Sequence, residues 1–343
     1  MTKALKLNTA NSSDRPAVLV TGGAGYIGSH SVMALTDHGW PTIVIDDLST
    51  GFQEHIPDGC PLIVGDVGDR ALVSRVLREH QCGAVMHFAG SIVVPESITD
   101  PLKYYSNNTI KSVALIEACI EAGVDTFVFS STAAVYGNPD RMPVDETFPL
   151  LPINPYGTSK VMTEWVLRDT AAASDLRYAA LRYFNVAGAD AAGRAGQRGP
   201  ESTHLIKVAC ETAVGKRDHL KIFGDDYDTV DGTCVRDFIH VSDLADAHVL
   251  ALEHLLSERQ NLILNCGYGH GFSVRQVIDS LNRIVDQPIT TIVDERRQGD
   301  PSELVADTGR IRQLIGWHPR RDDLEEILKS ALAWEHRLLG ANA

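Results

Sequence analysis

The feature that most constrains this fold is a short apolar strand that runs into a glycine-rich turn and then a helix. Residues Ala17–Thr21 form the apolar run, residues 22–28 read Gly-Gly-Ala-Gly-Tyr-Ile-Gly, and an amphipathic stretch follows over Ser29–Asp37. Glycines at 22, 25 and 28 allow a tight turn, a close approach of a phosphate to the backbone, and close packing of the helix. The pattern predicts a dinucleotide-binding unit with the pyrophosphate at the helix N-terminus.

Asp46 ends a second apolar strand, Thr42–Asp46, about 20 residues beyond the glycine-rich turn. A carboxylate at this position accepts hydrogen bonds from an adenosine ribose and repels a 2′-phosphate, so it favours NAD over NADP. Asp47 follows as a second candidate, and no arginine stands in the next few positions to hold a 2′-phosphate.

Short apolar strands alternate with long helices through much of the chain. Further strands are expected at residues 61–65, 84–88, 126–131, 178–183 and 262–266, and helices at 69–80, 102–122 and 157–173. The alternation predicts an α/β fold, a Rossmann-type doubly wound parallel sheet with a smaller C-terminal α/β substrate lobe. We expect an NAD-binding domain over 15–186 with a returning segment near 240–268, a substrate lobe over 187–239 and 269–343, and an N-terminal tail over 1–14.

Small and polar residues follow four of the expected strands. Because ligands of such sheets bind at the carboxyl ends of the strands, these positions are candidates for cofactor contacts. Asp66 could accept from an adenine amino group, whereas Ala89 and Gly90 leave room for the cofactor. The four strand ends read Asp66-Val67, Phe88-Ala89-Gly90, Ser130-Ser131-Thr132 and Tyr183-Phe184-Asn185.

Tyr156 and Lys160 are four residues apart in an expected helix, so they lie on one face, one turn apart. An ammonium beside a phenol favours the phenolate, which predicts that Tyr156 acts as a base near neutral pH. The hydroxyl of Thr132 could lie near Tyr156 and donate to a substrate oxygen.

Composition limits the partners of this chain. A formal charge of −14 gives the protein no general attraction for nucleic acid or anionic membranes. The sequence has no long apolar run and no secretory signal pattern, and the six scattered cysteines show no metal-ligand spacing. We therefore expect free thiols in a reducing cytoplasm, no metal site and no membrane span.

The region after Asn185 changes character. Residues 188–201 are expected to form a loop, 204–215 and 324–338 helices, and 220–224 and 233–240 strands. Arg236 and Arg297 are candidates for holding a diphosphate, because a planar guanidinium suits bidentate phosphate contacts.

The chain closely resembles the extended short-chain dehydrogenase/reductase superfamily and, within it, the UDP-glucose (UDP-galactose) 4-epimerase family. The resemblance covers nearly the whole chain and rests on residues 22–30, 87–90, 130–137, 155–160, 181–185, 231–240 and 296–300. It implies NAD-dependent, reversible epimerisation at C4 of a UDP-hexose through a transient 4-keto sugar. In this superfamily the helices at 102–122 and 157–173 pair across a two-fold axis, and both carry surplus apolar positions, so we expect a homodimer.

By this resemblance Tyr156 is the base, Lys160 lowers its pKa and holds the nicotinamide ribose, and Thr132 assists. The implied cofactor-binding residues are Gly22, Gly25, Tyr26, Ile27, Gly28, Asp46, Asp47, Asp66, Val67, Phe88, Ala89, Gly90, Asn107, Ser130, Tyr156, Lys160, Tyr183 and Phe184. The implied substrate-binding residues are Thr132, Asn185, His204, Leu205, Lys221, Phe223, Arg236, Arg297, Asp300 and Leu304.

Three positions depart from the family pattern. Ile92 stands where the family often has a lysine, and His204 stands where it has an asparagine. Leu304 occupies the position that gates the sugar pocket, where relatives carry a bulky tyrosine or a small residue. The preferred sugar therefore stays open.

The alternatives are related reactions on the same fold. A 4,6-dehydratase or a decarboxylase typically carries acidic residues after the threonine, where this chain has Ala133 and Ala134. A 4-epimerase for UDP-glucuronate, UDP-N-acetylhexosamines or UDP-pentoses remains possible. A non-catalytic NAD-binding sensor is disfavoured because such proteins usually lose the tyrosine or the lysine.

Overall fold

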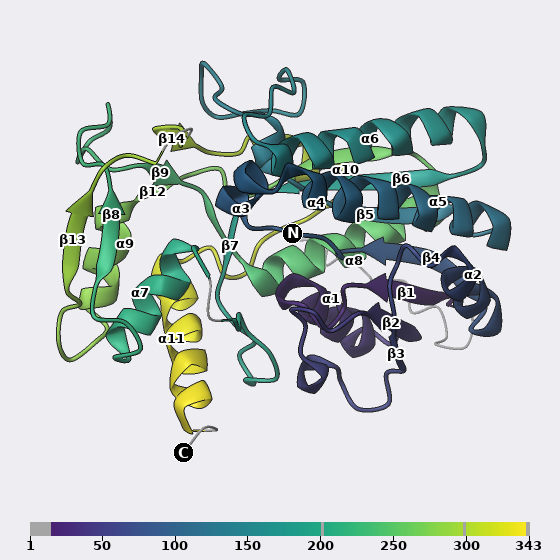
Figure 1. Ribbon diagram of the computed structural model, residues 1–343, viewed down its shortest axis with the longest axis horizontal. Helices are drawn as coiled ribbons and strands as arrows, with labels where there is room; N and C mark the ends of the chain where they lie inside the picture. Colours follow the sequence, from purple (N-terminus) through teal and green to yellow (C-terminus); the bar gives the residue numbers. More distant parts are fainter. Residues whose placement is uncertain (1–14, 200–201, 298–299, 341–343) are drawn as a thin grey trace, which may run out of the picture.

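A seven-stranded parallel sheet forms the centre of the larger part of the molecule (Figure 1). The computed structural model describes residues 15–199, 202–297 and 300–340. The strand order is β11-β6-β5-β4-β1-β2-β3, which confirms the predicted doubly wound sheet. The strands are β1 (Ala17–Thr21), β2 (Thr42–Asp46), β3 (Leu62–Val64), β4 (Cys82–His87), β5 (Thr126–Thr132), β6 (Arg177–Tyr183) and β11 (Leu262–Cys266).

Helices cover both faces of this sheet, because its strands are apolar on both sides. Val18 and Val20 of β1 pack in one core with α1 (Tyr26–Asp37) and α8 (Val241–Glu258). Leu19, between them, faces the opposite core, since successive side chains of a strand alternate. That second core contains residues of α2 (Arg70–Glu79), α5 (Lys111–Ala122) and α6 (Pro155–Ala173).

The helix predicted over 102–122 is not continuous. The chain forms α3 (Val94–Thr99), α4 (Pro101–Tyr104), a π-helical segment η2 (Tyr105–Ile110) and then α5. The carbonyl of Asn108 accepts hydrogen bonds from the hydroxyls of Ser112 and Thr163, which draws it out of the regular helical ladder. The first helix also begins at Tyr26 and not at Ser29.

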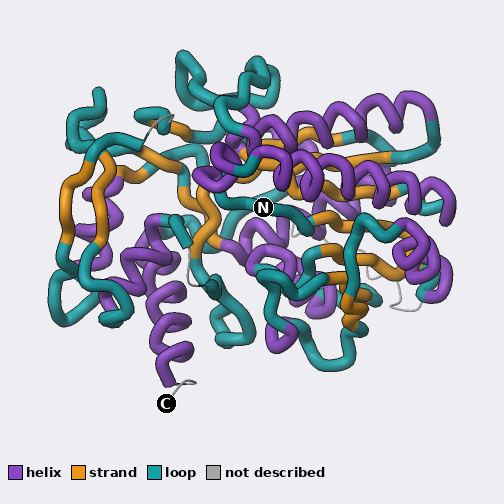
Figure 2. The backbone as a smooth tube through the Cα atoms, viewed as in Figure 1, coloured by secondary structure: helices purple, strands orange, loops and turns teal. Residues whose placement is uncertain are grey.

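Smaller sheets build the second lobe, at the left of Figure 1 and in orange in Figure 2. Parallel β8 (Leu220–Phe223) and β13 (Thr291–Asp294) form one pair, and β7 (Asn185–Ala187) and β10 (Phe238–His240) form another. Strand β9 (Val235–Arg236) lies between β12 (Phe272–Ser273) and β14 (Glu303–Leu304). The helices of this lobe are α7 (Leu205–Ala213), α9 (Val274–Asn282) and α11 (Leu324–Gly340). Helix α10 (Gly309–Ile315) packs against β11 and α8 of the larger part, which also contains the short 3₁₀ turns η1 (Gln53–His55) and η3 (Ala133–Val135).

The strand predicted over 233–240 is split at Asp237. Its first half pairs as β9 with β12 and β14, whereas its second half pairs as β10 with β7. Leu262–Cys266, from the segment near 240–268, then returns to the large sheet as β11.

The thiols match the prediction from sequence. All six cysteines are free; Cys60 is half-buried and the other five are buried. Within the described ranges, no helix is long and apolar enough to cross a membrane, and no group of three or more His, Cys, Asp or Glu side chains could hold a metal ion.

A buried ion pair fixes α6 to the sheet. Arg182 of β6 donates through Nε to Glu164 Oε1 at 3.0 Å and through Nη2 to Oε2 at 2.6 Å, and both side chains are 3% exposed. Ser131 of β5 donates to the same carboxylate at 2.5 Å. Two strands therefore hold one turn of the helix through a single carboxylate.

Replacing Glu164 by alanine should lower the free energy of unfolding by about 3–5 kcal/mol, because it leaves the Arg182 guanidinium buried without its counter-ion. Urea denaturation measures the loss. The matched control is Glu117→Ala on α5, whose ion pair with Arg70 is about half exposed and should contribute less than about 1 kcal/mol. Similar losses for both variants would contradict this role for the buried pair.

Candidate functional site

The carboxyl ends of the central strands bring the predicted cofactor residues to one edge of the sheet. Thr21 of β1 lies beside His87 of β4, and Thr132 of β5 lies beside Tyr183 of β6. The residues that follow these strands, including Phe88, therefore converge there.

The glycine-rich turn fits a pyrophosphate. Gly22 has a φ of +68°, and a Cβ there would lie 2.5 Å from Ala89 N. A Cβ on Gly28 would lie 2.1 Å from Gly22 O, whereas one on Gly25 would meet, among described atoms, Gly22 O alone, at 3.2 Å. No side chain caps the N-terminus of α1, so its first amides are left for an anion.

The side chains of Tyr26 and Ile27 point into the protein interior. Only their backbone groups are therefore available to a ligand at this turn. The Tyr26 hydroxyl donates to Gly188 O at 2.7 Å, and burial raises its pKa well above the ordinary value. Ile27 packs against the core that contains α1 and α8.

Asp46 holds the end of β2 against the glycine-rich turn. Its Oδ2 accepts from Ala24 N at 2.9 Å and its Oδ1 from Leu48 N at 2.8 Å. Burial raises the pKa of the Asp46 carboxyl, and these amides oppose the rise. The carboxylate thus shapes the turn, and its contact with an adenosine ribose stays a prediction.

The neighbouring acids are more exposed. Asp47 accepts from Ser49 N at 2.9 Å in a local turn. Asp66 pairs with Lys111 at 2.7 Å; partial burial raises the pKa of its carboxyl, but Lys111 and the Gly68 amide outweigh that effect and lower the pKa overall. Val67, next to it, is buried.

Lys160 is buried against β5. Its Nζ donates to Ser130 O at 3.0 Å and lies 5.0 Å from the centre of the Phe129 ring. Burial lowers the pKa of Lys160 to about 8. A Cβ on Gly90 would approach this ammonium to 3.7 Å, so the absent side chain keeps its surroundings open.

Tyr156 lies one turn before Lys160 on α6 and is 7% exposed. Burial raises the pKa of Tyr156, and the Thr132 hydroxyl opposes the rise in part. The spacing predicted the opposite direction, because it placed the ammonium beside the phenol. The ammonium instead donates to Ser130 O, and the pKa of Tyr156 in the chain without NAD is set by burial and Thr132.

Aromatic side chains line the same edge. The Tyr183 hydroxyl and Ser130 Oγ are 2.6 Å apart, and burial raises the pKa of Tyr183. The Phe88 ring lies 4.8 Å from the ring of His248 on α8. Phe184 is buried in a small apolar cluster that also contains Leu304 at its margin.

The predicted substrate residues gather at the small sheets. Leu304 of β14 lies directly beside Arg236 of β9, and Arg236 lies 3.7 Å from Asp300. The guanidinium of Arg297 stacks 3.8 Å from the centre of the Phe223 ring. Arg236 thus lies directly beside the predicted gate residue, whereas Arg297 lies against Phe223 of β8. We refer to Arg236 and Arg297 as the arginine group.

Other predicted substrate residues lie at the margin of this group. Lys221 is exposed on β8 and pairs with Asp294 at 2.9 Å, so its ammonium is engaged outside the arginine group. His204 precedes α7, contacts Gln197 at 2.8 Å, and leads into Leu205, the first residue of that helix. Asn185 begins β7 and donates its amide to Asp237 O.

Sequence reasoning missed Asn108, although it named its neighbour Asn107. Asn107 donates to Ser91 Oγ at 3.0 Å. The buried Asn108 accepts from Ser91 N at 2.7 Å and donates to Ser159 Oγ at 3.0 Å, so it joins the loop after β4 to the helix that carries Tyr156. The signal in the sequence was a pair of consecutive amides inside an otherwise helical stretch.

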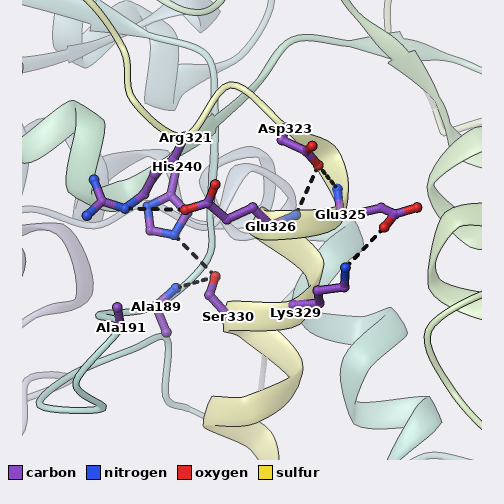
Figure 3. A pocket seen from close by; sticks show the side chains of 9 residues that line it. All are labelled: Ala189, Ala191, His240, Arg321, Asp323, Glu325, Glu326, Lys329 and Ser330. Atoms are coloured by element: carbon purple, nitrogen blue, oxygen red, sulfur yellow. Dashed lines mark hydrogen bonds and ion pairs between the residues drawn. The ribbon is translucent and has the colours of Figure 1, made fainter.

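A separate cavity of about 450 Å³ lies beside the start of α11 (Figure 3). None of the nine residues that line it belongs to the predicted site. Its polar groups are engaged with one another: His240 with Ser330, Arg321 with Glu326, and Lys329 with Glu325. We assign it no ligand.

Comparison with known proteins agrees with this geometry. The sequence profile of the NAD dependent epimerase/dehydratase family matches residues 18–267. A UDP-glucose 4-epimerase of Azospirillum brasilense is 58% identical over 330 residues, which cover 96% of this chain and 95% of that relative.

Solved structures of the same kind superpose closely. UDP-glucose 4-epimerase from Brucella ovis in complex with NAD has a TM-score of 0.90 at 43% identity, covering 93% of this chain and 98% of that one. The enzyme from Bifidobacterium longum in complex with NAD⁺ and UDP has a TM-score of 0.89 at 35% identity, covering 94% and 98%.

Replacing Gly28 by alanine should abolish retention of NAD, because the added methyl group would overlap Gly22 O and open the turn. The measurement is the nicotinamide nucleotide released on denaturing purified protein, per mole of chain. Gly340→Ala is the control, since a Cβ there meets nothing within 4 Å. Full NAD content in the Gly28 variant would show that the turn does not bind the pyrophosphate.

Proposed function

The chain belongs to the NAD dependent epimerase/dehydratase family, and on that premise we propose that it interconverts UDP-glucose and UDP-galactose by inverting C4 of the hexose. The arrangement that carries the proposal is the buried Tyr156 on α6, one helical turn from Lys160, with Thr132 close enough to lower the pKa of its phenol. The relatives named above support an isomerase with NAD as cofactor.

Residues at the strand ends are suited to hold NAD. The glycine-rich turn and the start of α1 would bind the pyrophosphate, and Asp46 the adenosine ribose. Lys160 would hold the nicotinamide ribose, with Tyr183 and Phe184 against the nicotinamide. NAD supplies, when bound, a ring that takes hydride from sugar C4 and gives it back.

Tyr156 is the group that would take the proton from the sugar 4-hydroxyl. Since burial favours the neutral phenol, the phenolate needs positive charge near it, and Lys160 is the cation that this helix provides. Thr132 can hydrogen-bond to the sugar oxygen and keep it in line with the phenol. The same phenol would return the proton after the 4-keto sugar has turned over.

The arginine group is suited to anchor UDP while the sugar turns. Arg236 and Arg297 can pair with the diphosphate. Asn185, at the start of β7, donates its amide to the carbonyl of Asp237, the residue that follows Arg236. Most of the binding energy would then fall on the nucleotide, which leaves the keto sugar few directional contacts to break.

The residues around Thr132 favour epimerisation over dehydration. Ala133 and Ala134 form the short turn η3 directly after it, and methyl groups cannot move the protons that loss of water requires. Related UDP-sugars remain candidates for the preferred substrate, because Leu304 is intermediate in size between the residues of the two family classes.

Tyr156→Phe should lower kcat by about 10²–10⁴-fold and leave UDP-sugar binding nearly unchanged, because it removes the proton acceptor but keeps the ring. The assay incubates the enzyme with UDP-glucose, UDP-galactose, their N-acetyl counterparts, UDP-xylose and UDP-glucuronate and identifies products by chromatography. Tyr178→Phe should keep wild-type turnover, because Tyr178 lies at the amino end of β6, opposite to the carboxyl ends that form the site. Near-normal turnover of the Tyr156 variant would refute the assignment.

We further propose that the enzyme is a cytoplasmic homodimer. Its thiols are free, as suits a reducing compartment. Apolar side chains remain exposed on adjacent helices (Figure 1): Leu102 at 75% and Ile120 at 48% on α4 and α5, and Trp165 at 46% on α6. Exposed apolar side chains on adjacent helices suit a partner with the same surface.

Trp165→Asp should convert a dimer into a monomer, because it places a charge in the middle of this apolar face. Sedimentation velocity at micromolar concentration measures the change. Val230→Asp is the control, since Val230 is fully exposed on a loop away from α5 and α6. A wild-type monomer at working concentration would end the dimer proposal.

A further inference from the structure

The Asp237 carboxylate is buried among backbone amides of two loops. It is 0% exposed. Its Oδ1 accepts from Tyr268 N at 2.8 Å, and its Oδ2 accepts from Gly269 N at 3.0 Å and from Ala306 N at 3.2 Å. The first two amides belong to the loop that follows β11, and the third lies two residues beyond Leu304.

The backbone of Asp237 joins two more segments. Its amide donates to Leu304 O at 3.2 Å, and its carbonyl accepts from Asn185 N at 2.9 Å. Because Arg236 precedes it in the chain, Asp237 touches or adjoins three residues that the proposed function assigns to UDP-sugar binding. No other role in the mechanism has been given to it.

We propose that Asp237 is a positioning residue of the UDP-sugar site. It fixes Arg236, which would bind the diphosphate, relative to Leu304, the residue that gates the sugar pocket. The proposal rests on the proposed function. Asp237 does not reach the reacting atoms, since its side chain is enclosed by the three amides and acts through the segments that they belong to.

The chemistry of the contacts requires a carboxylate. Three N–H donors point at two oxygens, and an asparagine would present an NH₂ group to at least one of them. Burial raises the pKa of Asp237 to about 6, although the three amides and nearby His270 oppose the rise. Burying a carboxylate costs desolvation free energy even when backbone amides donate to it. We therefore infer that Asp237 is needed to position the two loops more than to stabilise the fold.

The local backbone is built around this side chain. A Cβ on Gly267 would lie 2.5 Å from Asp237 Oδ2 and 2.8 Å from the Ala306 Cβ. Glycine at 267 therefore lets the loop close over the carboxylate. In consequence, Arg236 and Leu304 cannot shift independently, and a looser Asp237 should weaken nucleotide binding and sugar discrimination together.

The test is Asp237→Asn in the NAD-containing enzyme. We expect the Kd for UDP, measured by titration calorimetry, and the KM for UDP-glucose to rise about tenfold, with kcat changed less than about threefold. The preference for UDP-glucose over UDP-N-acetylglucosamine should fall as the gate loosens. NAD content should stay at the wild-type level, because the carboxylate does not adjoin the glycine-rich turn.

Glu335→Gln is the matched control. Glu335 is also buried, and its carboxylate pairs with Lys207 and with Lys216, away from the amides that hold Asp237. It should reduce stability but leave the UDP Kd unchanged. An equal loss of UDP affinity in this control would show a general loosening of the lobe and overturn the proposal.

Gly267→Ala serves if Asp237→Asn does not fold, because it displaces the carboxylate without removing its charge. The same rise in KM and Kd is expected. Wild-type UDP affinity and sugar preference in a folded variant of either kind would overturn the proposal. Absence of UDP binding by the wild-type enzyme would instead refute the proposed function, so the two failures are distinguishable.

Discussion

The buried pair between Arg182 and Glu164 is the interaction on which the site depends most. Tyr156, Lys160 and Glu164 follow one another at four-residue intervals along α6, and each meets β5: at Thr132, at the carbonyl of Ser130 and at the hydroxyl of Ser131. Arg182 then ties the same carboxylate to β6 and contacts the Tyr136 hydroxyl at 3.0 Å. A shift of α6 by one residue would break all of these contacts together. The position of the Tyr156 phenol therefore depends on the contacts of Lys160 and Glu164, which lie one and two helical turns after it.

Several ionisable side chains are buried, and burial disfavours their charged forms. Burial lowers the pKa of Lys160 and raises those of Tyr156, Asp46 and Asp237. Each is compensated by a small number of directed hydrogen bonds and not by exposure to water. Such groups contribute little to stability, but they are fixed in position and respond strongly to a charged ligand, which is what acid–base chemistry requires.

The sequence predicted the large sheet well, because its strands are short continuous apolar runs separated by clear helices. It also placed the strand ends that form the cofactor edge. It missed the π-helical segment around Asn108 and the division of 233–240 at Asp237, since both depend on hydrogen bonds to residues distant in the chain. The hydrogen bond from Lys160 to Ser130 O was not predicted for the same reason. Residue spacing indicates which face of the helix Lys160 lies on, but its acceptor belongs to β5 and depends on the tertiary structure. Lys221 was named from resemblance alone, and its pairing with Asp294 could not be seen before the two strands were known to be neighbours.

The order in which the chain visits the two sheet systems has a mechanical consequence. It leaves the large sheet after β6, builds β7 to β10, comes back through α8 and β11, and leaves again for β12 to β14. Because the chain crosses between the large sheet and the smaller sheets more than once, neither sheet system is formed by one continuous segment. Neither could therefore be cut out of the chain as a single piece. We therefore expect the two sheet systems to unfold together, so that NAD bound at the large sheet would also protect the smaller sheets from unfolding.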